Sequence, residues 1–216
     1  MFSIIIPAYN EEKYIEQTLH SISEQTDKDY ETIIVANGCT DNTITKAQKY
    51  PHLLLTAEKP HVSIARNLGA QHANGDILIF LDADTRLAPN ALATIRNEFS
   101  GAVATVSTYP NAPKFTYYLI NALKNLLHSM KLYKGSSGVI ITSASLFRKI
   151  NGFDISTIRE NSRLIRKLAK FGEYKLIKST YAITSTRRYE KWGLVHTTLF
   201  WLKNRWNSTA NYEAVR

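Results

Sequence analysis

The sequence predicts an α/β protein with a mostly parallel central sheet that is flanked by helices. Short apolar runs alternate with segments of helical periodicity over the first 81 residues, and such alternation favours a parallel sheet covered on both faces. The runs are continuously apolar, as in strands that are buried on both sides, and no internal repeat or flexible linker interrupts the chain. We therefore expect one continuous domain.

The first half is expected to follow a β-α-β-α-β-α-β order. Pro7 is expected to end the first apolar run. Ile15, Leu19 and Ile22 recur at the spacing of one helix face. Ser63 can cap the third helix, since its hydroxyl accepts a hydrogen bond from a free backbone N–H. The expected strands are 2–6, 31–36, 52–56 and 77–81, and the expected helices are about 12–24, 40–50 and 63–72.

The second half is less regular. Helices are expected at about 89–99, 115–130, 145–150 and 160–171, and strands at 102–108, 139–142 and 174–179. Two helical stripes stand out. The first is made of Phe115, Leu119, Ala122, Leu126 and Met130, with Lys124, His128 and Lys131 on the other faces. The second belongs to a C-terminal helix and is made of Trp192, Val195, Leu199, Leu202 and Trp206.

Composition and charge narrow the class of protein. The 27 basic and 18 acidic residues of this 216-residue chain give a net charge of +9, which favours polyanionic partners such as phosphorylated substrates or an anionic membrane. No zinc-ligand spacing or RNA-binding aromatic motif accompanies the charge, so nucleic acid is not expected as a partner. Cys39 is the sole cysteine and cannot form an internal disulfide. With no leader pattern and no apolar run near ~18 residues, we expect a cytoplasmic protein.

Two carboxylates stand one residue apart in Asp82-Ala83-Asp84, directly after the apolar run 77–81. They would emerge at the C-terminal end of a buried strand, where open α/β sheets bind their ligands. Like charges so close together repel unless a cation or a hydroxyl-rich ligand separates them. Hard oxygen donors of this kind suit Mg²⁺ or Mn²⁺ carrying a diphosphate. A solvated turn is the alternative interpretation, because Asp is common in turns.

Several motifs in a fixed order make the chain resemble family 2 glycosyltransferases. These motifs are residues 3–12 at the first strand, 37–41 after the second, 65–69 in the third helix, and 75–76 before the Asp pair. The resemblance is close over about residues 1–100 and looser over 135–175. It implies a single Rossmann-like domain of the GT-A type with a C-terminal helical extension. It also implies transfer of a sugar from a nucleoside diphosphate donor, with inversion at the anomeric carbon.

The resemblance implies a set of nucleotide-sugar-binding residues. Simpler alternatives exist for two of them, since Glu11 can be a helix-start acid and Arg66 a solvated helix residue. Relatives often carry a carboxylate where this chain has Ala36-Asn37, so uridine cannot be assumed as the base. The complete set is Pro7, Ala8, Tyr9, Glu11, Asn37, Arg66, Asp82, Ala83 and Arg187.

The resemblance also implies a divalent metal, Mg²⁺ or Mn²⁺, and a catalytic base. Asp84 would coordinate the metal, and Asp82 would contact the metal or the ribose. Relatives often carry an acidic Glu-Asp pair as the source of the base, but here the pair reads Glu160-Asn161, and an amide cannot accept the proton. Glu160 is then the candidate base with Asp154 behind it, and a helix-start acid is the alternative role for Glu160.

Residues 1–100 are expected to bind the nucleotide-sugar, and residues 101–216 to bind the acceptor and supply the C-terminal helix. The acceptor would be a glycan or a lipid-linked molecule. The basic, Trp-containing C-terminal helix suggests peripheral contact with the inner face of a membrane, although a helix packed on the core explains the same residues.

Three other functions compete with the glycosyltransferase. A catalytically silent sugar-nucleotide-binding protein is suggested by Ala36 and Asn161, which replace expected carboxylates. A nucleotidyltransferase has a similar sheet, but its Gly-rich first loop is absent here. A nucleic-acid-binding module is supported by charge alone.

Overall fold

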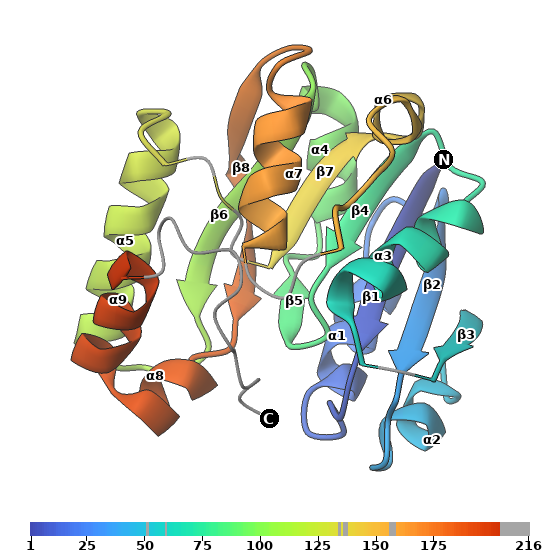
Figure 1. The fold of residues 1–216 in the computed structure, drawn as a ribbon, viewed down its shortest axis with the longest axis horizontal. Coiled ribbons are helices and arrows are strands. Elements are labelled where there is room, and N and C mark those ends of the chain that lie inside the picture. The colour runs from blue at the N-terminus through green and yellow to red at the C-terminus, as the bar shows by residue number, and fades with distance from the viewer. Residues whose placement is uncertain (51, 59, 134, 136–137, 156–158, 204–216) are drawn as a thin grey trace.

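The computed structural model describes residues 1–203 except for 51, 59, 134, 136–137 and 156–158. It contains one sheet with helices on both faces (Figure 1). The strands are β1 (Phe2–Ala8), β2 (Tyr30–Asn37), β3 (Leu53–Ala57), β4 (Ile77–Leu81), β5 (Thr85–Leu87), β6 (Val103–Pro110), β7 (Val139–Ser143) and β8 (Tyr174–Thr184). The helices are α1 (Ile15–Ser23), α2 (Thr43–Ala47), α3 (Val62–Gln71), α4 (Ala91–Glu98), α5 (Phe115–Ser129), α6 (Ala144–Lys149), α7 (Glu160–Leu168), α8 (Arg187–Trp192) and α9 (Leu194–Lys203).

The strand order in the sheet is β3-β2-β1-β4-β7-β6-β8-β5. The first four strands run parallel, with β1 between β2 and β4. β7 then pairs antiparallel with both β4 and β6, while β6 and β8 pair parallel to one another. The carboxyl ends of β1, β2 and β4 therefore open at the same edge of the sheet.

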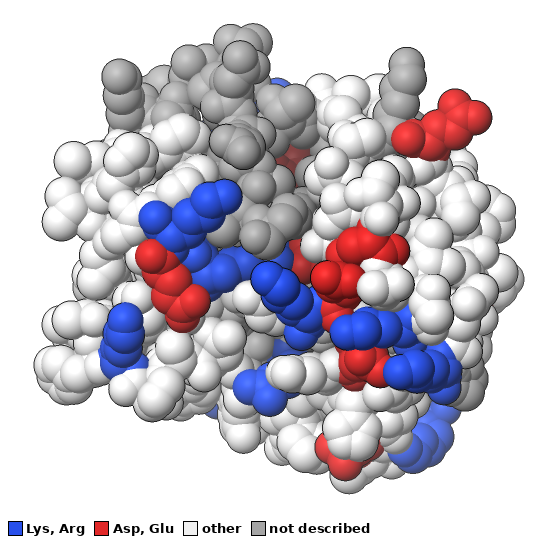
Figure 2. Space-filling model, turned by 90° about the horizontal axis from the view of Figure 1, so that it is seen from below, with Lys and Arg blue, Asp and Glu red and all other residues white. Residues whose placement is uncertain are grey.

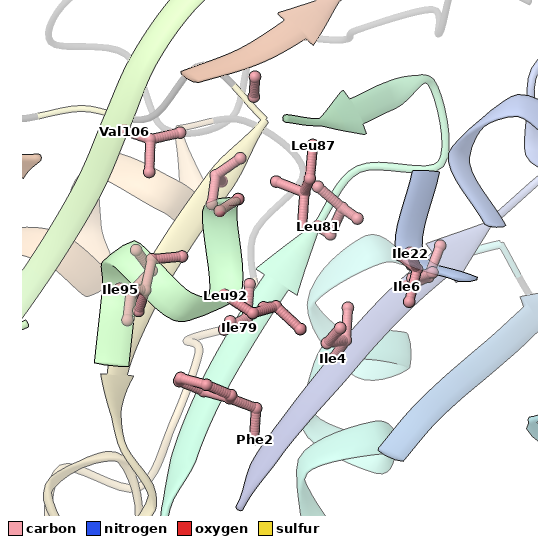
Figure 3. Packing of buried hydrophobic residues seen from close by; sticks show 14 of the residues in the cluster. Phe2, Ile4, Ile6, Ile22, Ile79, Leu81, Leu87, Leu92, Ile95 and Val106 are labelled. Carbon is pink, nitrogen blue, oxygen red and sulfur yellow. The ribbon is translucent and has the colours of Figure 1, made fainter. Parts of the chain in front are cut away.

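Two hydrophobic cores lie on opposite faces of this sheet, which explains why the strand sequences are continuously apolar. Successive side chains of a strand point to opposite faces, so Ile4 and Ile6 enter one core and Ile5 enters the other. The core of Ile4 and Ile6 is closed by α1 and α4 through Ile22, Leu92 and Ile95 (Figure 3). The other core is closed by α3, α6 and α7, with Ala65, Phe147 and Leu164 among its members.

The expected α/β fold with a mostly parallel sheet is confirmed, and the element order of the first half matches element by element. One detail of that half is wrong. Pro7 does not end the first strand, because β1 continues to Ala8. Pairing with β4 stops at Ile5, whereas pairing with β2 continues to Ala8, so Pro7 lies where only one neighbouring strand needs hydrogen bonds.

Two features of the second half were not predicted. A short strand, β5, follows the Asp pair and pairs antiparallel with β8. The C-terminal helix is divided at Gly193, whose φ of 74° lies in the left-handed region, so α8 and α9 are separate helices and no single stripe joins Trp192 to the rest. The side chain of Leu202 and all of Trp206 lie outside the described residues. None of the helices in the described part of the chain is long and apolar enough to span a bilayer.

Candidate active site

Charged side chains gather at the sheet edge where β1, β2 and β4 end. This edge faces downward in Figure 1, and Figure 2 shows the molecule from that side, with Asp and Glu interspersed among Lys and Arg over the middle of the face. The carboxyl ends of parallel strands are where the sequence predicted a ligand site around Asp82 and Asp84.

The turn after β4 holds the two carboxylates of Asp82-Ala83-Asp84 apart. The Asp82 N–H donates to the Gly138 carbonyl at 2.9 Å, and the Thr85 N–H donates back to the Asp82 carbonyl at 3.0 Å. The Thr18 hydroxyl fixes the buried Ala83 carbonyl at 2.8 Å. Because the backbone is bonded on both sides, the side chains of Asp82 and Asp84 project in set directions, and each meets a different arginine.

Asp82 contacts Arg66, which lies on α3 and is 3% exposed. The Arg66 Nη2 donates to Asp82 Oδ1 at 2.7 Å, while Nη1 donates to Glu160 Oε1 at 3.0 Å and to Asn161 Oδ1 at 2.8 Å. The guanidinium also lies over the Phe153 ring, 5.1 Å from its centroid. Burial alone would lower the pKa of Arg66, but the charges of Asp82 and Glu160 outweigh it and raise that pKa.

Asp84 contacts Arg187, the first residue of α8. The Arg187 Nη2 lies 2.9 Å from Asp84 Oδ2, and the guanidinium also forms a two-pronged pair with Glu11 at 2.6 and 2.8 Å. Burial raises the pKa of the Asp84 carboxyl to about 6, and the nearby Asp82 and Glu11 carboxylates add to this effect, while Arg187 opposes it. At neutral pH, Asp84 is thus an ionised carboxylate in surroundings that disfavour its charge.

The donor atoms here fit a divalent cation that also binds phosphate. Within the described residues no group of three or more His, Cys, Asp or Glu side chains could enclose a metal ion. Asp82 and Asp84 offer two carboxylates at one turn, and one or two carboxylates are what Mg²⁺ usually takes from a protein when substrate phosphates supply other ligands. A cation would also relieve the charge that burial disfavours on Asp84.

The expected nucleotide loop lies beside this turn. Pro7 and Ala8 are the last residues of β1 and are buried, and Tyr9 follows them half-buried. The buried Asn37 at the end of β2 donates its amide to the Ala8 carbonyl at 2.9 Å. Asn37 therefore ties the ends of β1 and β2 together, a structural role that the sequence did not indicate.

The two candidate bases lie in different surroundings. Glu160, the first residue of α7, is brought into the Arg66 cluster and is 15% exposed. The Asp154 carboxylate instead accepts from Lys167 Nζ at 2.9 Å and is half exposed. Among the described contacts, the structure joins Glu160 to Asp82 through Arg66, and it does not join Asp154 to that cluster.

Three neighbours of the arginines were not assigned by sequence reasoning. Asn161 accepts a hydrogen bond from Arg66, and the Phe153 ring lies under the same guanidinium. The Tyr14 ring lies under Arg187, with its centroid 4.9 Å from the guanidinium carbon. Phe153 directly precedes the candidate base Asp154 in the chain, so its position was a usable signal. Nothing in the local sequence marks Tyr14, because its partner lies far away in the chain.

Comparison with known proteins identifies the family of this chain. The family model described as "Glycosyl transferase family 2" matches residues 3–152, well over half of the chain. The putative teichuronic acid biosynthesis glycosyltransferase TuaG of Bacillus subtilis is 35% identical over 92 residues, which cover 40% of this chain and 36% of TuaG. The match thus spans well under half of that relative.

Solved structures share the fold at low sequence identity. The structure of S. aureus TarS 1–349 in complex with UDP-GlcNAc has a TM-score of 0.69 at 20% identity, covering 86% of this chain and 58% of that chain. The mannosyltransferase PcManGT from Pyrobaculum calidifontis, in complex with GDP-Man and Mn²⁺, has a TM-score of 0.71 at 20% identity, covering 97% and 65% of the two chains. The fold is therefore that of GT-A glycosyltransferases.

Proposed function

This chain belongs to glycosyl transferase family 2, and on that premise we propose that it transfers a sugar from a nucleoside diphosphate sugar to an acceptor hydroxyl. The observation that carries the proposal is the pair of carboxylates at the end of β4, each held by one arginine, beside the ends of β1 and β2. Alternating cations and carboxylates suit a ligand that is itself a diphosphate with a hydroxyl-rich group at each end.

The donor would lie across the ends of β1, β2 and β4. Pro7, Ala8, Tyr9 and Asn37 would contact the base and ribose. Arg187 would face the diphosphate, because guanidinium groups form directional, charge-assisted bonds with phosphate oxygens. Its contact with Asp84 in the present structure keeps the guanidinium at this position before a donor arrives.

A divalent cation, Mg²⁺ or Mn²⁺, would be held by Asp84 and Asp82. When bound, such an ion neutralises charge that builds on the departing diphosphate. Asp84 is the better ligand of the two, because burial disfavours its charge and raises its pKa to about 6 even with Arg187 beside it, and a divalent cation would offset this. Asp82 would keep its hydrogen bond with Arg66 through Oδ1 and offer Oδ2 to the ion or to the ribose.

Glu160 would act as the catalytic base in an inverting transfer. The acceptor oxygen forms a bond to the anomeric carbon as the bond from that carbon to the diphosphate oxygen breaks, and the acceptor proton passes to the Glu160 carboxylate. Arg66 contacts Glu160 through Oε1, which leaves Oε2 as the atom to take the proton. Asp154 is the second candidate, because it follows Phe153 in the chain, although its carboxylate pairs with Lys167 and not with the Arg66 cluster.

Residues 101–160 would hold the acceptor, for which we propose a cell-envelope or lipid-linked glycan. This class is favoured by the likeness to TuaG, whose name refers to teichuronic acid biosynthesis. A catalytically silent sugar-nucleotide-binding protein is the second candidate. It is favoured by the ion pair between Glu160 and the buried Arg66, since a carboxylate held by a cation is a weaker base.

The proposal is tested by diphosphate release from a panel of nucleotide-sugars, with Mn²⁺, with Mg²⁺ and with a chelator. We expect metal-dependent release, and we expect Asp84→Ala to lower its rate by about a hundredfold or more, because the metal supplies several kcal/mol of charge stabilisation. Asp76→Ala is the matched control, since Asp76 is 91% exposed and lies at the opposite end of β4. Full activity of Asp84→Ala would refute the metal site, and donor binding without release would favour the silent protein.

A further inference from the structure

Helix α5 carries its apolar stripe on the outside of the molecule. An amphipathic helix ordinarily turns this stripe toward the core. In α5 and the residue after it, five large apolar side chains at helical spacing are instead 53–80% exposed. They are Phe115, Leu119, Leu123, Leu126 and Met130, called here the α5 stripe. The helix lies at the outer edge of the fold, away from the two cores (Figure 1).

The opposite face of α5 is the buried one, and it is polar. Asn121 accepts from the Thr108 hydroxyl at 3.1 Å, and the buried His128 is bonded to the Tyr174 hydroxyl. Lys124 donates to the Tyr189 hydroxyl at 2.8 Å. Rotating the helix to bury the stripe would break these bonds and leave buried polar groups on β6 and β8 without partners. The exposure of the α5 stripe is therefore fixed by the packing of the helix.

The segment that carries the stripe is basic, although Glu173 of a neighbouring loop pairs with Lys131 at 3.3 Å. From residue 99 to residue 153 the sequence has six Lys or Arg and no Asp or Glu. Lys114 and Lys131 lie at the two ends of the stripe, and both are exposed. An apolar stripe with lysines at its margins is the pattern of a helix that lies in the interface of an anionic bilayer, where apolar side chains enter the acyl boundary and lysines reach the head groups.

We propose that the α5 stripe, with Lys114 and Lys131, binds the surface of an anionic lipid membrane. A second copy of the chain fits this surface less well. Around a two-fold axis the same patch would face itself and bring the lysines of the two copies together, and among the described ion pairs Glu173 is the sole acidic partner, bound to Lys131. The inference differs from contact through the C-terminal helix, because α5 precedes the strands β7 and β8 and the helices α6 to α9.

The test is co-sedimentation of the full chain with vesicles of phosphatidylcholine alone or mixed with phosphatidylglycerol. We expect binding to the mixed vesicles only. The double variant Leu119→Ser/Leu126→Ser should weaken that binding by about tenfold or more, since each leucine loses apolar area that would enter the bilayer. The double variant Lys114→Gln/Lys131→Gln should weaken vesicle binding by about fivefold for each lysine. The binding that remains should depend less on salt concentration.

Two matched variants make the result specific. Leu53→Ser/Phe171→Ser removes two apolar side chains of similar exposure, 43% and 51%, from other surfaces and should bind like the unaltered chain. Val195→Ser/Leu199→Ser removes two apolar side chains from α9, where they are 71% and 59% exposed, and should also bind like the unaltered chain. Circular dichroism of each variant checks that the helices are retained.

Three outcomes would overturn the proposal. The first is failure of the unaltered chain to bind the mixed vesicles, and the second is loss of binding in the α9 variant with full binding in the α5 variant. The third is a dimer, seen by light scattering, that the α5 substitutions convert to a monomer, because the stripe would then face a second copy. None of these outcomes depends on sugar transfer, so the proposal fails or stands separately from the proposed enzymatic function.

Discussion

The two carboxylates at the end of β4 are paired with arginines from two very different regions of the molecule. Arg66 belongs to α3, which packs on β1 and β2 so closely that a side chain in place of Gly69 would come within 2.5 Å of Ile5. Arg187 begins α8, a helix that buries none of its own side chains. Asp82 is thus paired with a cation from a helix that closes a core, and Asp84 with a cation from a helix outside both cores, although the Arg187 side chain itself is only 14% exposed.

This difference indicates which of the two carboxylates can exchange its arginine for another cation. Removing the Arg66 guanidinium from Asp82 would require movement of a helix that closes one of the two cores. Moving Arg187 away from Asp84 would disturb its pair with Glu11 and its contact with Tyr14, but α8 contributes no residue to either core. Asp84 is therefore the carboxylate that can give up its arginine for another cation while the fold stays intact.

The largest expected effect is on stability when Arg66 is replaced. Arg66→Met keeps most of the side-chain volume but leaves Glu160 and Asp82 without their cation, and breaking a buried ion pair in this way costs about 3–5 kcal/mol. Urea unfolding at neutral pH measures the loss. Arg163→Met is the control, because Arg163 lies on α7 without a described side-chain partner, and it should cost under about 0.5 kcal/mol. Equal stability of the two variants would mean that the Arg66 cluster contributes nothing to the fold.

The second effect is a pH dependence that belongs to Asp84. Its folded pKa of about 6 lies above the ordinary value of 3.8, so the folded chain binds this proton more tightly than the unfolded chain. The resulting stability is present below pH 3.8 and is lost as the pH rises through 6. Compared with Asp84→Asn, the unaltered chain should therefore lose about 3 kcal/mol of unfolding free energy between pH 4 and pH 7. Urea titrations across this range measure the difference.

His128 supplies a control of opposite sign. Burial, aided by the charge of Lys124, lowers the pKa of His128 from 6.5 to about 4. The unfolded chain then binds this proton more tightly, so the stability that His128 contributes is present above pH 6.5 and is lost as the pH falls toward 4. Relative to His128→Gln, the unaltered chain should gain stability as the pH rises. The same slope for both variants would contradict the assignment of the pKa shifts to these two sites.

The half of the molecule that holds Arg66 was predictable from the sequence. Its strands are continuously apolar because both faces are covered, and α1 turns Ile15, Leu19 and Ile22 inward as its spacing indicates. The carboxyl ends of parallel strands meet at one edge, so the position of Asp82 and Asp84 followed from the apolar run before them.

The other half was less predictable for physical reasons. The spacing of α5 gives its stripe but does not say which face the rest of the fold will cover, and here the bonds of Asn121 and His128 decide. The pairing of Arg187 with Glu11 joins residues 176 positions apart, and no local pattern encodes such a contact. Likewise β5 is a three-residue strand that, within the described residues, pairs with β8 alone, so it exists through tertiary pairing.

The smallest expected effect is on Mn²⁺ binding and concerns the pair of Asp84 and Arg187. If Arg187 and a divalent cation compete for Asp84, Arg187→Ala should bind Mn²⁺ more tightly than the unaltered chain in the absence of donor, by about tenfold for a competing ion pair worth ~1.4 kcal/mol. Donor binding should weaken in the same variant, because the guanidinium that would face the diphosphate is gone. Electron paramagnetic resonance of free Mn²⁺ measures the first effect and calorimetry the second. Lys191→Ala, an exposed cation on the same helix, should leave both unchanged. Weaker Mn²⁺ binding in Arg187→Ala would mean that Arg187 supports the cation site instead of competing for it, and that the two arginines act alike.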